Sequence, residues 1–301
     1  MENRNSTNFL TLPTLTTLDF AFNKIGDVGA KHFADALQHN IKLTNLNLQF
    51  NHIGDVGAKH LAHALQYNTV LSSLDLSHNQ IGAVGAQYLA YALQHNTTLT
   101  TLNFSCNGID LVFGIDLVHG IGDVGAKHFA DALQHNAVLT SLDLSHNQIG
   151  DVGAQYLADA LQHNTVLISL DLSRNEIEDV GTKHLTHALQ HNATLTTLNF
   201  AHNGISIVHG IGDVGAKHFA DALQHNTVLI SLNLSHNQIG DVGAQYLADA
   251  LQYNTALTTL HLRWNKIGHV GAQYLANALQ YNTVVVILFL SIRCLHVHFL
   301  I

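Results

Sequence analysis

Charged residues and proline are both scarce in this sequence. Asp, Glu, Lys and Arg together make up 11% of the 301 residues, against roughly 25% in an average soluble domain. Proline occurs once, at Pro13, which excludes a proline-rich linker, and no run of like charges indicates a disordered tail. The polar surface must therefore come mostly from Asn, Gln, Ser, Thr and His.

Cysteine is also rare, because only Cys106 and Cys294 occur. Two such distant cysteines give neither a disulfide framework nor a CxxC metal-ligand spacing. Residues 1–12 lack the basic start and the long apolar run of a signal peptide. These absences predict a reducing compartment, and we expect the protein in the cytoplasm.

The chain is poor in basic residues, and its formal net charge is −9 with neutral histidine. It therefore lacks the basic stripe with which a protein displaces counterions from phosphate, and we expect no nucleic-acid partner. The charge permits a basic protein partner without requiring one.

One sequence unit recurs along almost the whole chain. Its first leucine returns every 28 residues, with two interruptions, at Leu15, Leu43, Leu71, Leu99, Leu139, Leu167, Leu195, Leu229 and Leu257. Val285 starts a partial tenth unit. A period of this length predicts a solenoid, in which each unit buries its apolar face only against its neighbours.

Each unit opens with the pattern L-x-x-L-x-L/F-x-x-N-x-I. Apolar and polar residues alternate with period two over residues 74–77, which predicts a short strand. The Asn that follows, such as Asn79, is expected to bond backbone groups left unpaired at the strand end. Stacked units would then carry a ladder of nine such asparagines.

The second half of each unit has the period of a helix. In the first unit, small or apolar residues recur at Ala30, Phe33, Ala34 and Leu37, which is one helix face. We expect the helix N-cap at Asp27 and a left-handed residue near the end of the helix, at Asn40.

Together these features predict the α/β class: parallel strands on the concave face and helices on the convex face of a curved horseshoe. We expect about nine repeats and a partial tenth in one domain over residues 1–301. The repeats run from about residue 15 to 290, with insertions at 109–120 and 205–210 and an atypical tail at 291–301.

The extended pattern L-x-x-L-x-L-x-x-N-x-I-G-D-x-G-A-x-x-L-A-x-A-L resembles the leucine-rich repeat of ribonuclease inhibitor. Similar repeats occur in the C-terminal region of NOD-like receptors and in Ran-directed GTPase-activating proteins. The resemblance implies a leucine-rich-repeat solenoid that binds proteins. The chain lacks the many cysteines of ribonuclease inhibitor, and no GxxxxGK[ST] motif marks a nucleotide-binding domain.

Both insertions lie between the turn Asn and the helix, so we expect them to bulge from one rim. They resemble copies of one hexamer, and Leu111, Val112 and Phe113 would form an apolar rim patch there. One interpretation is a contact loop. The other is duplication slippage that a surface loop tolerates.

The C-terminal residues 283–301 continue apolar after the expected tenth strand. Nineteen residues could just span a bilayer, but Arg293 would lie mid-segment, at a cost of roughly 2.5–3.5 kcal/mol. We therefore favour a makeshift end cap over a membrane anchor.

Three columns of residues are expected to line the concave surface. The first is Asp19, Asn47, Asp75, Asn103, Asp143, Asp171, Asn199, Asn233 and His261. The second is Ala21, Gln49, Ser77, Ser105, Ser145, Ser173, Ala201, Ser235 and Arg263. The third, next to the turn Asn, is Phe22, Phe50, His78, Cys106, His146, Arg174, His202, His236 and Trp264.

Aromatic and Arg residues are the usual anchors of protein interfaces, and the first column is acidic in its middle. The candidate partner-binding residues are therefore Phe22, Phe50, Asp75, Asp143, Asp171, Arg174, Arg263 and Trp264. The acidic column favours a basic partner protein.

No sequence motif indicates catalysis, because GxSxG, HExxH and a reactive Cys–His motif are all missing. The 24 histidines recur one repeat apart and do not converge, so we expect no metal site and no cofactor. They would make a surface responsive to pH, although copying of one unit explains their number equally well.

The leading hypothesis is therefore a non-enzymatic module that binds a partner protein through its concave face and loop rim. Three alternatives stay open: a Ran-directed GTPase-activating protein, a fragment of a NOD-like innate immune sensor, and a duplicated chain without a selected function.

Overall fold

The computed structural model describes residues 15–107, 120–204, 210–284 and 287–289. It contains two compact units, of which unit 1 ends at Asn147 and unit 2 begins at Gln148. Residues 109–119, 205–209 and 290–301 lie outside the described part. The interpretations of the insertions and of the tail therefore stay predictions, as do the single domain and the curvature of the whole chain.

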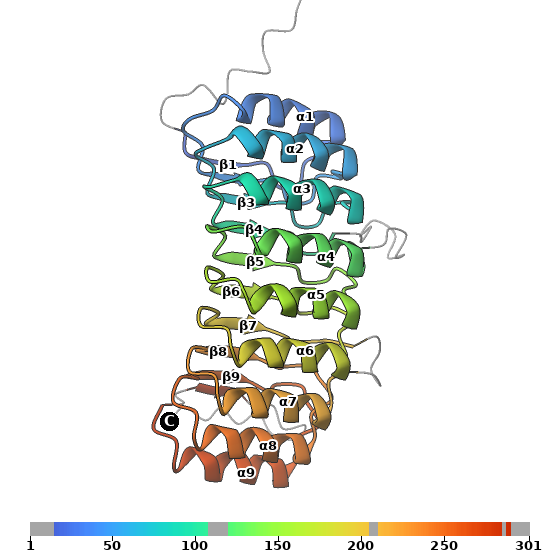
Figure 1. The fold of residues 1–301 in the computed structure, drawn as a ribbon. Coiled ribbons are helices and arrows are strands. Elements are labelled where there is room, and N and C mark those ends of the chain that lie inside the picture. The colour runs from blue at the N-terminus through green and yellow to red at the C-terminus, as the bar shows by residue number, and fades with distance from the viewer. Residues whose placement is uncertain (1–14, 108–119, 205–209, 285–286, 290–301) are drawn as a thin grey trace, which may run out of the picture. The chain divides into compact units, whose positions relative to one another are not determined.

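Unit 1 alternates strands with helices in the predicted order (Figure 1). Its elements are β1 (Thr17–Asp19), α1 (Gly26–Leu37), β2 (Asn45–Asn47), α2 (Asp55–Tyr67), β3 (Ser73–Asp75), α3 (Ala83–His95), β4 (Thr101–Asn103), α4 (Gly122–Leu133) and β5 (Ser141–Asp143). Each strand pairs in parallel with the next one along the chain.

Unit 2 continues the same alternation (Figure 1). Its elements are α5 (Asp151–Leu161), β6 (Ser169–Asp171), α6 (Asp179–Leu189), β7 (Thr197–Asn199), α7 (Asp213–Leu223), β8 (Ser231–Asn233), α8 (Asp241–Leu251), β9 (Thr259–His261), α9 (His269–Leu279) and β10 (Ile287–Phe289). The parallel pairing of β10 with β9 confirms the partial tenth repeat.

The core of each unit lies between the strand layer and the helix layer. Strand register places each leucine beside its equivalent one repeat away, as in Leu46 opposite Leu74. Leu74, Leu76 and Ile81 of one repeat are at most 1% exposed. Alanines on the inner helix face, such as Ala86, are buried as well, and their small size lets the helix approach the strands closely. These contacts confirm the predicted solenoid architecture.

Three repeats carry a phenylalanine pair in place of two leucines in this core. A strand-side ring meets a helix-side ring edge-to-face, with centroids 4.8–5.4 Å apart, in the pairs Phe20–Phe33, Phe104–Phe129 and Phe200–Phe219. Such pairs contribute roughly 0.5–1.5 kcal/mol beyond burial. The two substitutions occur together because each ring fills the space beside the other.

The predicted asparagine ladder is confirmed. The Asn79 side-chain amide donates to the backbone oxygens of Leu48 in the previous repeat, at 3.0 Å, and of Leu76 in its own, at 3.0 Å. Its Oδ1 accepts the backbone N–H groups of Asn51 and Ile53, each at 3.0 Å. Asn79 thus joins neighbouring repeats through buried hydrogen bonds, whereas the exposed Asn23 of the first repeat bonds only within its own repeat.

A second asparagine ladder runs along the helix ends. Asn68 donates to the Leu37 oxygen of the previous repeat at 2.7 Å, and its Oδ1 accepts the N–H of Leu71 at 2.7 Å. The prediction of a left-handed residue here is wrong, because Asn68 is extended, with φ −74° and ψ 125°, and Asn40 does not have positive φ. The side chain, and not a left-handed backbone, satisfies the groups left by the helix end.

The predicted N-cap at Asp27 is also wrong, because this residue caps the helix of the next repeat. Asp27 Oδ1 accepts the backbone N–H of Gly54 at 2.8 Å and of Gly57 at 2.9 Å. These are the N-cap and third residues of α2, whose N–H groups have no partner inside the helix. A Cβ on Gly57 would lie 2.7 Å from that carboxylate oxygen, so the close approach requires glycine.

The same bond to the helix of the next repeat is formed by Asp55, Asp151, Asp213 and Asp241. Helix α1 follows no such residue, and the repeat before α4 has Ala83 instead. These two helices begin differently, each with a glycine of positive φ, Gly26 (58°) and Gly122 (56°). The preceding repeat therefore determines how a helix starts.

The insertion at 205–210 interrupts both kinds of inter-repeat bond. Asp179 precedes α7 by one repeat, yet its Oδ1 is buried and has no hydrogen-bond partner in the described structure. Asn203 Oδ1, on the turn just before the insertion, is likewise buried and has no hydrogen-bond partner in the described structure. The six extra residues thus leave two buried acceptors unsatisfied, which costs roughly 1–3 kcal/mol each.

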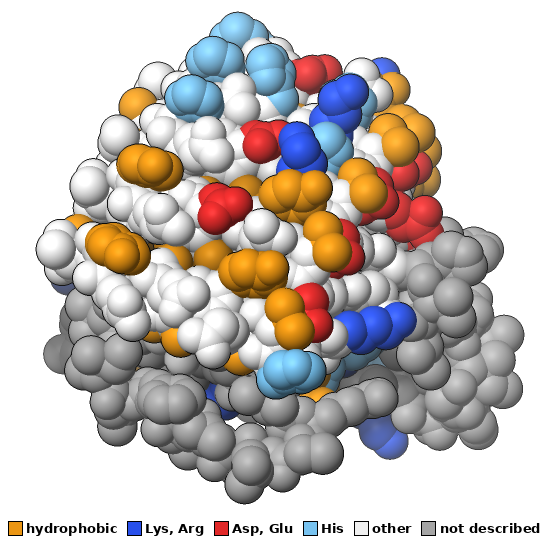
Figure 2. Space-filling view, turned by 90° about the horizontal axis from the view of Figure 1, so that it is seen from below, with side chains coloured by type: hydrophobic (Ala, Val, Ile, Leu, Met, Phe, Trp, Pro, Cys, Tyr) orange, Lys and Arg blue, Asp and Glu red, His pale blue; other side chains and the backbone are white. Residues whose placement is uncertain are grey.

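Among the described residues, no helix follows α9. Ala276 of α9 is exposed, whereas its equivalent Ala248 in α8 is 2% exposed. In the view from this end, hydrophobic side chains of the described residues are scattered among polar ones (Figure 2).

Candidate partner-binding surface

The first column lies on the strand face opposite the core, because its residues alternate with buried leucines. Each Asp or Asn in it accepts a backbone N–H from two residues onward through Oδ1. The distance is 2.8 Å for Asp75, Asp143 and Asp171 and 3.0–3.2 Å for Asn47, Asn103, Asn199 and Asn233. Asp and Asn alternate freely because only this shared oxygen is needed for the turn.

Two of the three predicted acidic residues also bond to a neighbouring repeat. Asp75 Oδ2 accepts the Asn103 amide at 3.0 Å, and Asp171 Oδ2 accepts the Asn199 amide at 2.7 Å. The carboxylates therefore have structural partners before any protein binds. A basic ligand would have to add to these bonds or displace them.

The second column lines the surface only in part, because four of its nine residues are buried and the other five are partly exposed. Ser77 is completely buried, and Ser105, Ser173 and Ser235 are each 8% exposed. The reason is that each strand ends after three residues, so the period-two alternation stops before this position. Arg263, the one predicted site residue in this column, is partly exposed.

The third column, which we call the rim column, has a left-handed backbone throughout. All nine residues have φ between 53° and 60°, a conformation that costs an ordinary residue roughly 1–2 kcal/mol. The following ladder Asn closes the turn, as when Asn79 donates to the Ser77 oxygen at 3.2 Å. The asparagine bonds thus hold bulky side chains where glycine would be the unstrained choice.

The rim backbone is also tied from repeat to repeat. The N–H of Phe50 donates to the Ser77 oxygen at 3.2 Å, and that of His236 to the Arg263 oxygen at 2.8 Å. Equivalent bonds start from Phe22, His78, Cys106, Arg174 and His202. These hydrogen bonds between the backbones of neighbouring repeats fix the position from which each of these rim side chains starts.

In unit 1 the rim side chains stack on one another. The rings of Phe22 and Phe50 lie 4.4 Å apart at 15°, and those of Phe50 and His78 lie 4.0 Å apart at 11°. The column continues with Cys106, whose Sγ lies 3.4 Å from His146 Nδ1. The structure thus brings the predicted site residues Phe22 and Phe50 together.

In unit 2 the rim column is built from different side chains. His202 and His236 stack at 5.0 Å and 18°, and His236 and Trp264 at 5.5 Å and 17°. Arg174 precedes them and is exposed. The predicted site residues Arg174 and Trp264 therefore lie at the two ends of one column, joined by two histidines.

Burial and nearby charge lower the pKa of several of these histidines. Burial lowers the pKa of His236, and the charges of His202 and Arg174 lower it further. Burial also lowers the pKa of His261, with Arg263 adding to the effect. In unit 1, burial lowers the pKa of His78, while the Asp75 carboxylate opposes the shift. Neutral imidazole is therefore favoured at these positions.

Each unit has a large, exposed aromatic side chain in its part of the rim column. Phe22 is 72% exposed and Trp264 is 61% exposed, although large aromatic side chains usually bury most of their surface. The sequence interpretation placed His78, His202 and His236 in this column but did not predict that they stack or name them as contact residues. The only signal was that ring or Arg side chains recur immediately before the turn Asn.

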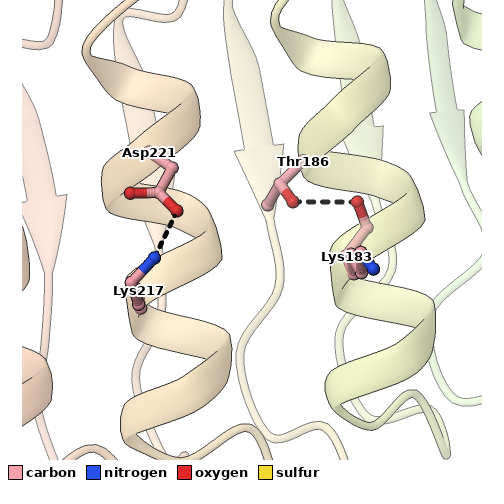
Figure 3. A network of polar contacts seen from close by, with 4 residues as sticks. All are labelled: Lys183, Thr186, Lys217 and Asp221. Atoms are coloured by element: carbon pink, nitrogen blue, oxygen red, sulfur yellow. Dashed lines mark hydrogen bonds and ion pairs between the residues drawn. The ribbon is translucent and has the colours of Figure 1, made fainter.

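The helix side shows ordinary surface contacts. Lys217 pairs with Asp221 one turn along α7 at 2.9 Å, and both side chains are about half exposed (Figure 3). Within the described residues, no group of three or more His, Cys, Asp or Glu could hold a metal ion. No helix among them has the length and apolar character needed to cross a bilayer.

Comparison with known proteins identifies the repeat. The leucine-rich-repeat family matches residues 11–34, 39–62, 67–90, 95–111, 135–158, 163–185, 191–206, 225–248 and 253–276. The chain belongs to the leucine-rich-repeat family. Leucine-rich repeats are generally binding scaffolds without catalytic groups of their own, which supports a role in protein interaction.

A solved structure of the leiomodin-1 actin-binding site 2 resembles this leucine-rich-repeat chain. The likeness has 29% sequence identity, covers 43% of this chain and 71% of that chain, and has a TM-score of 0.37. This TM-score is too low for the likeness to bear on function. None of the curated proteins matches the chain.

Proposed function

We propose that this leucine-rich-repeat protein is a non-enzymatic module that binds a partner protein through its strand face and rim column. The residues in contact are Phe22, Phe50, Asp75, Asp143, Asp171, Arg174, Arg263 and Trp264. The observation that carries the proposal is the rim column: strained backbone holds large rings in stacks whose ends, Phe22 and Trp264, are mostly exposed. Backbone strain concentrates at functional sites because something must compensate for its cost.

The experiment is partner capture with the full chain and its rim variants. The variants Phe22→Ala and Trp264→Ala should each weaken the complex by roughly tenfold or more, as expected of aromatic anchors. Tyr253→Ala is the matched control, because Tyr253 is 75% exposed and lies outside the rim column. A complex that tolerates both rim variants would contradict the proposal.

Two finer points belong to the same proposal. We place the chain among repeats of the ribonuclease-inhibitor-like kind, on the pattern quoted above. We also propose the cytoplasm as its location, because Cys106 and Cys294 give no disulfide framework, as is usual in a reducing compartment.

The resemblance also supports two alternatives, a Ran-directed GTPase-activating protein and a fragment of a NOD-like sensor. No described residue favours either of them. A mixing experiment tests the first, because a GTPase activator accelerates GTP hydrolysis by its partner. Sequencing of the neighbouring reading frame tests the second, because a receptor would encode a nucleotide-binding domain there.

A further inference from the structure

The two units differ in the charge of their strand and rim columns. In unit 1 these columns contain Asp19, Asp75 and Asp143 and neither Lys nor Arg. In unit 2 they contain one acid, Asp171, against Arg174 and Arg263. The sign of the net charge in these columns therefore differs between the units, whereas the sequence interpretation described one acidic column on a polar face.

The single acid of the unit 2 columns already has partners. The Asp171 oxygens accept the Ser173 N–H at 2.8 Å and the Asn199 amide at 2.7 Å. Arg174 is exposed, and no carboxylate in the described part of the chain forms an ion pair with it. Just past the rim, Glu176 and Lys266 carry opposite charges. The columns therefore keep an excess of positive charge.

The side chains between the two arginines add to this surface. His202, His236 and Trp264 form a continuous stack of nearly parallel rings. All three side chains are exposed. Burial is the main cause of the lowered pKa of His236, and the charges of His202 and Arg174 lower it further. Neutral imidazoles still offer N–H donors to an anionic ligand.

We propose that Arg174, His202, His236, Arg263 and Trp264 bind an acidic, extended segment of the partner protein. The inference rests on the proposed function and gives the chemistry of the partner. Carboxylates of the segment bind the two guanidinium groups, for which their geometry is well suited. An apolar side chain of the segment lies against the Trp264 ring.

The spacing of the column fits an extended chain. Arg174 and Trp264 are separated by three strand spacings of about 4.8 Å, or about 14 Å. Residues four apart in an extended chain lie on the same side, about 13 Å from one another. The segment therefore needs an acidic residue and, four residues away, an apolar one.

Fluorescence of the full chain tests the inference, because Trp264 is its single tryptophan. One probe is a nine-residue peptide that alternates glutamate and serine and has a leucine four residues after the first glutamate. The second probe has lysine in place of each glutamate. We expect the acidic peptide to change Trp264 fluorescence saturably, with a dissociation constant at least about tenfold lower than that of the basic peptide. Added salt should weaken this binding.

Charge-reversal variants give the matched control. Arg174→Glu and Arg263→Glu should each weaken binding of the acidic peptide by about tenfold or more. Lys183→Glu makes the same change of charge in the same repeat, on helix α6 (Figure 3), and should alter binding less than twofold. Circular dichroism confirms that each variant is folded.

Equal response to the two peptides, or tight acidic-peptide binding by Arg174→Glu, would overturn the inference. If Trp264→Ala no longer captures the partner but the acidic peptide does not bind the protein, the inference is overturned and the proposed function stands. A captured partner that tolerates every strand-face and rim variant would overturn the proposed function instead.

Discussion

Units 1 and 2 have the same backbone along the rim and different side chains on it. Phe50 and His236 both have a left-handed backbone, and both donate their N–H to the next repeat. Yet Phe50 stacks between Phe22 and His78. His236 stacks between His202 and Trp264. The difference shows that the turn fixes where a side chain lies, whereas the residue type is free to define what it binds.

The comparison first requires that the scaffold be equivalent in the two units. Asn79→Ala and Asn237→Ala should each lower the free energy of unfolding by about 3 kcal/mol, because each leaves several buried backbone groups without partners. Asn23→Ala should cost much less, since its exposed amide bonds only within its own repeat. Urea unfolding measures all three. A large loss in one unit alone would mean that the ladders are not equivalent.

The units differ where the 205–210 insertion interrupts a helix cap. Asp55→Ala should destabilise the protein by about 2 kcal/mol, because Asp55 accepts the N–H groups of Gly82 and Gly85, each at 2.8 Å. Asp179→Ala should instead raise stability by about 1 kcal/mol, since it removes a buried Oδ1 that has no hydrogen-bond partner. Thermal or urea unfolding measures both changes. Asp213→Ala, in unit 2 with an intact cap, should behave like Asp55→Ala.

The cost of the left-handed rim should be the same in both units. Arg174→Gly should be more stable than Arg174→Ala by about 1 kcal/mol, because only glycine adopts this backbone without strain. Cys106→Gly against Cys106→Ala makes the same comparison in unit 1. Urea unfolding of the four variants gives the two differences. A glycine variant less stable than its alanine counterpart would show that the rim is not strained.

Titration of the rim histidines gives the smallest effect and separates the two units electrostatically. Both His78 and His236 should titrate below 6.5, as followed by their ring proton signals in NMR. Arg174→Ala should raise the pKa of His236 by removing a repelling charge. Asp75→Asn should lower that of His78 further by removing an attracting one. Shifts in the opposite directions would contradict the described surroundings.

The lowered pKa values of His78 and His236 also determine in which direction the stability of the protein changes with pH. The unfolded histidines bind protons more tightly than the folded ones, so folding is favoured at neutral pH. The contribution is lost as the pH falls through about 6.5 toward the lower folded pKa.

Local sequence patterns predicted the strands, the helices and the ladder around Asn79, because each rests on residues within one repeat. The cap from Asp27 was misassigned because the N–H groups that donate to its carboxylate are 27 and 30 residues away, in the next repeat. The left-handed rim was not predicted because Phe22 and Trp264 are residue types that rarely adopt such a backbone. Ser77 was assigned to the surface because period two does not show that the strand stops at Asp75.

The direction of the helix caps affects how such a chain can change length. A repeat that contains this Asp supplies a carboxylate to the helix of the repeat after it, so such a repeat carries its own joining chemistry. Residues 146–162 recur unchanged as residues 236–252, and both contain the Asp that serves the following helix. Recombination that adds or removes complete units of this kind therefore keeps the carboxylate bond between neighbouring repeats. An insertion inside a unit, such as residues 205–210, instead leaves a buried oxygen of Asp179 without a hydrogen-bond partner.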